Sequence, residues 1–459
     1  MSVVNSQAKQ YEMMTQTPIP KLIFKLGIPT TVSMLVTNIY NMADTYFVGT
    51  LGTSASGAVG IVFGLMAIIQ AIGFMLGHGA GSVISRKLGA KDKATAGLVA
   101  SASFFTSLGA GLLLCVFGLI FIEPLLGVLG STPTILPFAK DYALWILLAS
   151  PVTMASFVLN NILRYEGKAS LAMIGLTTGG IINIFGDWLL IDVFSMGISG
   201  AGISTAVSQC ISFFILLSMF LRKKTESTIS LKNFVKGFSQ LKVIIPTGFP
   251  SLMRQGFSSV STMLLNNFAG LYGDAAVAGM TIVGRISFFI FAVALGIGQG
   301  FQPVSAFNYG AGKYNRVKKG FFFTLGVGEV FLATLSFIGM FFTDTLVGFF
   351  RDDPQVVEIG SFALKLQLVA LFFHPLCVCA NMMFQSIGKN KVATFLSALR
   401  SGLTFIPILV ILSNILGLTG VQISQTVADI VTFVITLPFV VNFFKQLPSD
   451  LSDKSECQQ

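Results

Sequence analysis

The chain has 459 residues, of which 53% are hydrophobic and 10% are charged, against about 25% charged residues in an ordinary soluble protein. So few charges could not cover the surface of a soluble protein of this length, which excludes soluble enzymes, nucleic-acid binders and disordered scaffolds. The net charge of +10 therefore has to be interpreted from the positions of the cations.

Twelve stretches of the chain are long and apolar enough to cross a bilayer. A transmembrane helix needs about 20 apolar residues, and this template fits twelve times, with short polar breaks between the matches. The pattern predicts an all-α polytopic membrane protein. Its spans, in chain order, are 25–47, 55–84, 95–120, 137–161, 169–191, 198–221, 244–268, 276–306, 319–343, 358–382, 392–413 and 420–443.

The distribution of Lys and Arg predicts how these spans are oriented, because cations near span ends stay on the cytoplasmic side. With a cytoplasmic N-terminus, 24 of the 29 cations lie inside, Arg400 counted among them. We therefore expect both termini in the cytoplasm and a location in the inner or cell membrane. The other five are Lys140, Arg351 and Lys365 outside, and Arg254 and Arg285 within spans.

An internal repeat runs through the chain at an offset of 221 residues, and each copy holds six spans. An even number of spans gives both copies the same orientation, as in parallel transporter repeats. We predict an N-terminal lobe (1–221), a basic cytoplasmic linker (222–242), a C-terminal lobe (243–445) and a polar tail (446–459). The matched residues are Gly27, Pro29, Gly49, Gly52, Gly77, Gly79, Gly89, Asn160, Gly167 and Lys168, with Gly248, Pro250, Gly270, Gly273, Gly298, Gly300, Gly310, Asn381, Gly388 and Lys389.

Acidic residues inside the spans are informative because an ionised carboxylate in hydrocarbon is costly and marks an ion or substrate pathway. Asp44 lies 19 residues beyond Lys25, and Asp187 lies 19 residues beyond Lys168. At 1.5 Å per residue, both carboxylates reach a level roughly 28 Å from the inner cations. We expect the two to act as a pair in the outer part of the membrane.

Polar residues share the helix faces of this pair. Asn183 is one turn before Asp187, and Tyr40 and Asn41 are one turn before Asp44. Such oxygen-rich surroundings suit a proton, a sodium ion or a cationic ligand, and Asn160 would add another amide. The alternative reading is that each aspartate only caps or hydrogen-bonds a neighbouring span.

The second lobe lacks the acidic pair, because Leu265 and Ile408 stand at the matching positions. One lobe would thus handle the coupling cation, while both lobes line the substrate cavity. Arg254, beside Gln255 in span seven, needs a partner, for which Glu329 or a lipid headgroup is available.

Two further acids and the two histidines favour structural roles. Glu329 and Asp429 stand alone in spans nine and twelve, and neither His78 nor His374 lies in a metal-binding spacing. The chain also lacks a phosphate-binding loop, so we expect transport to run on an ion gradient and not on ATP. It offers no nucleophile, base and orienting group on adjacent faces, so we expect no enzyme activity, and no cofactor beyond a proton or sodium ion as coupling ion.

Several segments resemble the multidrug and toxic compound extrusion (MATE) family over nearly the whole chain. These are Gly27 to Pro29, Asn41 to Asp44 running into Gly49, Asn183 to Asp187, Gly298 to Pro303, and Asn308 to Ala311. The resemblance is to the bacterial branch with a cation site in the N-terminal lobe. It implies a cation site at Asp44, Tyr142, Asn160, Asn183 and Asp187. If sodium is the coupling ion, we expect Asp44, Asp187 and Asn183 to hold it. The residues that we expect to line the substrate cavity are Tyr40, Asn41, Arg254, Gln255 and Gln299.

The resemblance also implies the function. A MATE protein of this branch would be a monomeric secondary transporter that exchanges protons or sodium for amphipathic, cationic drugs by alternating access, in contact with lipid and not with nucleic acid. The alternative is a lipid-linked oligosaccharide flippase of the related fold, which would need a more cationic cavity.

Overall fold

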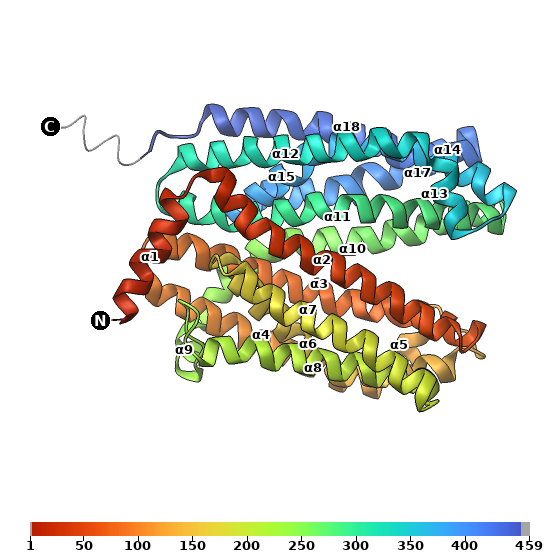
Figure 1. The fold of residues 1–459 in the computed structure, drawn as a ribbon, viewed down its shortest axis with the longest axis horizontal. Coiled ribbons are helices and arrows are strands. Elements are labelled where there is room, and N and C mark those ends of the chain that lie inside the picture. The colour runs from red at the N-terminus through yellow and green to blue at the C-terminus, as the bar shows by residue number, and fades with distance from the viewer. Residues whose placement is uncertain (1, 451–459) are drawn as a thin grey trace. The chain divides into compact units, whose positions relative to one another are not determined.

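The computed structural model describes the backbone of residues 2–450 and the side chains of all of these except residues 2–7 and 53. The part of the predicted polar tail from residue 451 onward lies outside the described residues. Within them the chain is helical and forms no strand (Figure 1). The helices are α1 (Ser2–Gln16), α2 (Ile19–Gly49), α3 (Thr53–Gly89), α4 (Lys93–Ile120), α5 (Ile122–Val128), α6 (Leu136–Tyr165), α7 (Ala169–Asp187), η1 (Trp188–Val193), α8 (Gly197–Leu221), α9 (Leu231–Gly237), η2 (Phe238–Gln240), α10 (Leu241–Gly270), α11 (Asp274–Gly310), α12 (Tyr314–Phe341), α13 (Thr343–Phe350), α14 (Pro354–Ala370), η3 (Leu371–Phe373), α15 (His374–Ser386), α16 (Asn390–Ala398), η4 (Leu399–Thr404), α17 (Phe405–Leu416) and α18 (Leu418–Lys445).

Eleven helical stretches of the described chain are long and apolar enough to cross a membrane, and they match every predicted span except the seventh. That span corresponds to α10, which has 30 residues but is less apolar. Its middle carries Arg254 and Gln255, whose polarity lowers the mean hydropathy of the helix.

Three of the predicted spans contain irregular turns. A π-helical turn, η1, follows α7, and a second, η4, separates α16 from α17. In the tenth span a 3₁₀ turn, η3, comes directly before His374 and Pro375, where the proline lacks the N–H that a continuous α-helix would use. Turns of this kind often occur at functional sites, and η4 holds Arg400.

Contacts divide the chain into two compact units. Unit 1 contains Val32–Leu252 with the first helix, and unit 2 contains Thr15–Thr31 with the chain from Met253 onward. The boundaries fall inside α2 and α10, just after Pro29 and Pro250, so each of these helices begins in one unit and continues in the other.

Glycines related by the internal repeat allow the first part of α2 to pack in unit 2 and the first part of α10 to pack in unit 1, which we call the exchange of helix starts. In unit 2, Gly27 of α2 lies against Gly300 of α11, and a Cβ on Gly300 would be 2.5 Å from the Gly27 Cα. In unit 1, Gly248 of α10 lies against Gly79 of α3 in the same manner. Because 221 residues separate Gly27 from Gly248 and Gly79 from Gly300, the repeat appears in the structure as two equivalent close crossings of backbones.

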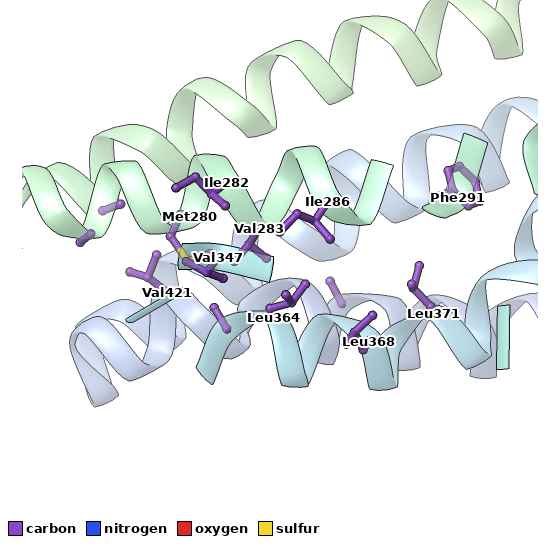
Figure 2. Close-up of a cluster of buried hydrophobic side chains, with 14 of the residues drawn as sticks. Met280, Ile282, Val283, Ile286, Phe291, Val347, Leu364, Leu368, Leu371 and Val421 are labelled. Atoms are coloured by element: carbon purple, nitrogen blue, oxygen red, sulfur yellow. The ribbon is translucent and has the colours of Figure 1, made fainter. Parts of the chain in front are cut away.

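Each unit has its own apolar core. In unit 1 it includes Val62, Leu65 and Leu147 around the fully buried Tyr142. In unit 2, Figure 2 shows Ile286 of α11 with Leu364 and Leu368 of α14.

The basic linker is attached to the loop between α6 and α7 through Glu166. This buried carboxylate accepts the backbone N–H groups of Glu226 and Ser227, both at 2.8 Å, and the Ser227 hydroxyl. Burial raises the pKa of Glu166 above its usual value, although these bonds and Lys168 at 3.9 Å favour the charged form.

Ion pairs complete the attachment. Glu226 lies 3.2 Å from the Lys168 ammonium and 3.3 Å from that of Lys93. Burial alone would raise the pKa of Glu226, but the two lysines hold it below its usual value. The start of the linker is therefore fixed to unit 1.

Candidate functional site

Asp44 and Tyr142 are joined directly in unit 1. The Tyr142 hydroxyl, on α6, donates to Asp44 Oδ2 at 3.3 Å, and the tyrosine is fully buried. The other Asp44 oxygen, Oδ1, is buried and accepts no hydrogen bond from any described residue. Only one of the two Asp44 carboxylate oxygens therefore accepts a hydrogen bond from a described residue.

Asp187 is the last residue of α7, at the junction with the π-turn η1. Its side chain is fully buried, and neither carboxylate oxygen accepts a hydrogen bond within the described chain. It lies close enough to Asp44 for the two charges to repel, and Tyr142 is near both. A buried carboxylate without a donor is costly unless a cation or proton compensates it.

Asn183, one turn before Asp187, is oriented by α8. Its amide Nδ2 donates to Thr205 Oγ1 at 3.2 Å, and its backbone carbonyl accepts the Ser204 hydroxyl at 2.9 Å. Nδ2 also donates to the Ser204 hydroxyl oxygen at 3.4 Å, and Asn183 Oδ1 is left buried without a donor in the described residues. The amide therefore offers an oxygen acceptor on the same side of α7 as the carboxylate.

Four buried oxygens are thus left without donors: both of Asp187, one of Asp44 and one of Asn183. Such a set can bind a cation, either as protons on the carboxylates or as a sodium ion between oxygen ligands. In the part of the chain that the structure describes, no group of three or more His, Cys, Asp and Glu side chains could hold a metal ion. A sodium ion would have to take neutral oxygens beside the two carboxylates.

Tyr40 and Asn41 lie on α2 one turn before Asp44. Tyr40 packs against Gly180 of α7, and with Asn183 and Thr205 it lines a cavity of about 10 Å³, room for one water molecule. Asn41 is partly buried, and its backbone carbonyl accepts the Thr45 hydroxyl. Both residues therefore belong to the surroundings of the pair.

Asn160 is not part of this cluster. Its amide donates to the Ala172 carbonyl at 2.9 Å, which ties α6 to α7. Ala172 is 15 residues before Asp187 on the same helix, roughly 22 Å along its axis. The repeat mate Asn381 makes the equivalent bond to Ala393, which points to a common structural role.

The predicted cavity residues Arg254, Gln255 and Gln299 all lie in unit 2. Arg254 Nη1 donates to Asn381 Oδ1 at 3.2 Å, whereas Glu329 forms no ion pair with any described residue. Gln255 is partly buried in α10, and Gln299 is buried in α11. The suggestion that Glu329 neutralises Arg254 is wrong.

Unit 2 contains an ionic cluster that the sequence did not indicate. Asp429 Oδ2 lies 2.8 Å from His374 Nε2, and Asp429 Oδ1 accepts from Arg400 Nε at 2.8 Å and from Gln425 at 3.1 Å. Asp429 is therefore not isolated, and Arg400 belongs inside its span instead of with the cytoplasmic cations. The three residues come from different spans. The one signal in the sequence is that charged residues inside membrane spans usually pair with one another across helices.

A family model described as MatE matches residues 29–189 and 250–411, which is more than half of the chain. The chain belongs to the MatE family. The two matched stretches begin 221 residues apart, at the offset of the internal repeat.

Named relatives of this MatE protein are export proteins. Over 444 residues it is 28% identical to "Multidrug export protein MepA" of Staphylococcus haemolyticus, which covers 96% of this chain and 98% of the relative. Over 446 residues it is 27% identical to the protein of the same name from Staphylococcus aureus, with the same two coverages. These names agree with a transporter and not an enzyme.

Solved structures of other transporters share the fold. A transporter of the MOP superfamily from Pyrococcus furiosus gives a TM-score of 0.89 at 27% identity, covering 95% of this chain and 99% of that one. A multidrug resistance MATE family transporter, solved in an outward-facing conformation, gives 0.88 at 27% identity, covering 94% and 97%. The predicted fold class, an all-α protein of many membrane spans, is confirmed.

Proposed function

We propose that this MatE protein is a secondary multidrug exporter in which a proton or sodium ion bound at Asp44 and Asp187 drives the outward movement of amphipathic, cationic compounds. The observation that carries the proposal is the pair of buried carboxylates near Tyr142, with three carboxylate oxygens lacking donors. The relatives named as multidrug export proteins support the substrate class.

The coupling follows from charge. With both aspartates ionised the site carries two negative charges in a buried place, and cation binding removes the repulsion between them. Two conformations that differ in their access to water would differ in affinity for the cation, so a gradient across the membrane would bias one over the other. We assign both termini to the cytoplasm on the distribution of cations, and we treat the protein as a monomer.

The flippase alternative would use Arg254 and Arg285 as its cavity cations. Arg254 donates to Asn381, whereas Arg285 lies exposed on α11. One exposed arginine does not make the more cationic cavity that a lipid diphosphate would need, so the flippase remains the second candidate.

The test is uptake of a fluorescent cation into everted membrane vesicles, in which an exporter moves its substrate inward, with proton and sodium gradients imposed separately. Asp187→Asn keeps the shape of the side chain but removes its charge, and we expect the rate to fall by at least about tenfold, equivalent to roughly 1.4 kcal/mol. The matched control is Asp192→Asn, five residues further on, where the aspartate is exposed and the rate should be unchanged. Wild-type transport by Asp187→Asn, or transport driven by neither gradient, would reject the proposal.

A further inference from the structure

The linker helix α9 exposes an apolar stripe. Leu231 and Val235 of α9 and Phe238, the first residue of the following turn η2, lie at helical spacing and are 67%, 76% and 60% exposed. Lys232 and Lys236 are exposed beside this stripe, one position after Leu231 and Val235. Apolar residues flanked by lysines are the pattern of a helix that lies in a membrane interface.

The opposite side of α9 is packed. Phe234 contacts Phe105 of α4 with ring centroids 5.3 Å apart, and Gly237 lies so close to Leu98 that a Cβ would be 2.6 Å from the Leu98 carbonyl oxygen. The Ser101 hydroxyl accepts the backbone N–H of Ser230 just before the helix. The exposed stripe is therefore held in a fixed direction, away from unit 1.

The contacts with α4 give the depth of α9 in the bilayer. With 28 residues, α4 is about 42 Å long, some 12 Å more than the hydrocarbon core. Leu98 and Phe105 lie roughly 8 Å and 18 Å from its Lys93 end. If both ends of α4 extend equally, the hydrocarbon begins roughly 6 Å from the Lys93 end. The Leu98 contact is then close to the interface and the Phe105 contact lies within the hydrocarbon, so α9 lies where an exposed apolar stripe meets lipid.

The cations of the linker form no ion pair with the described residues. The linker's one acid, Glu226, is already bound to Lys93 and Lys168. No ion pair within the described chain involves its six cations, which are Arg222, Lys223, Lys224, Lys232, Lys236 and Lys242.

We propose that α9 is a binding site for anionic phospholipid, with Leu231, Val235 and Phe238 among the acyl chains and Lys232 and Lys236 on the headgroup phosphates. The apolar stripe, the adjacent lysines and the depth along α4 together fit a lipid better than a soluble anion, which would not contact the stripe. The proposal is independent of what the protein transports.

The test uses a reporter on α9. The full-length chain carrying Val235→Trp is reconstituted in phosphatidylcholine nanodiscs that contain an equal fraction of either brominated phosphatidylglycerol or brominated phosphatidylcholine. The brominated lipid quenches tryptophan fluorescence, and the quenching measured for the protein without the substitution is subtracted. We expect brominated phosphatidylglycerol to bind beside the added tryptophan on the order of 25-fold more strongly, since each of the two lysines near a charged membrane contributes about a fivefold gain.

Lys232→Gln with Lys236→Gln should abolish this preference, and Lys232→Arg with Lys236→Arg should retain it. The control, Lys223→Gln with Lys224→Gln, removes the same charge from the linker outside α9 and should keep the preference. Equal losses in the two glutamine pairs would mean attraction by net charge without a site, and equal quenching by both lipids would mean apolar contact alone. Either result, or no quenching at all, would overturn the proposal.

Discussion

Tyr142 is the residue whose position the structure specifies most sharply, since it is fully buried and donates to Asp44 from a different helix. A hydrogen bond from a neutral donor to a carboxylate is worth about 1.5–3 kcal/mol. Tyr142 is thus placed to orient Asp44 and to stabilise its charge while Asp187 remains without a donor.

Tyr142→Phe removes this hydroxyl and leaves the ring in the core. We expect efflux to fall about three- to tenfold, less than for Asp187→Asn, because a donor to the site is lost and both carboxylates remain. Initial rates in vesicles measure the effect. Tyr46→Phe changes a tyrosine of α2 that is 70% exposed and lies two residues after Asp44; it serves as control and should behave as wild type.

At the scale of elements, the cluster of His374, Arg400 and Asp429 links α15, η4 and α18. The π-turn η4 places Arg400 beside the buried carboxylate of Asp429. An uninterrupted α-helix would point the arginine in a different direction. Removing one partner of a buried ion pair costs about 3–5 kcal/mol, because the other charge is left uncompensated.

Asp429→Leu should therefore lower the melting temperature in detergent by several degrees, as followed by scanning fluorimetry. Glu329→Leu is the matched change at a partly buried acid without an ion pair, and it should lower the temperature less or not at all. Equal effects of the two substitutions would show that the cluster adds no stability.

The linker attachment depends on pH through Glu226. Since the two lysines hold the pKa of folded Glu226 below the usual 4.5, its contribution to stability is present above that value and is lost as the pH falls through the lowered pKa. Glu166, whose pKa is raised by burial, has the opposite dependence: its contribution is full below 4.5 and is lost as the pH rises.

Glu226→Gln should consequently melt about 2 °C below wild type near pH 7, and the difference should shrink as the pH falls through the lowered pKa, because the wild-type carboxyl then becomes protonated. Melting curves of the purified protein across this range provide the measurement. Glu123→Gln, which breaks only the exposed pair with Lys140, should melt like wild type throughout. A difference that persists unchanged at low pH would contradict the role given to Glu226.

At the scale of the whole molecule, the repeat and the exchange of helix starts explain one another. A helix that begins in one unit and continues in the other must cross a neighbour at close range, and only glycine lets two backbones approach in this way.

Gly248→Ala places a methyl group on the Met75 carbonyl, which cannot move without shifting α3. We expect a loss of about 1–3 kcal/mol in stability, the usual cost of overpacking, and a lower yield of folded protein. Gly256→Ala, eight residues further along α10 where a Cβ would meet no atom within 4 Å, should leave melting and yield unchanged. If both variants melt alike, the close crossing is not needed for folding.

The sequence alone determined the membrane class, the extent of most spans, the parallel repeat and the pair Asp44 and Asp187, because hydropathy, spacing and the cost of a buried charge act along one helix at a time. The sequence also suggested that Asn160 shares the cation site with Asp44 and Asp187. In the structure its amide donates to the Ala172 carbonyl instead, because an amide can bond to any backbone carbonyl that lies opposite it. Only the tertiary structure decided the contact of Tyr142 with Asp44, the Arg400 cluster and the exchange of α2 and α10 between units. These depend on which faces of distant helices meet, and a hydrophobic stretch by itself does not say which of its faces is buried against protein and which against lipid.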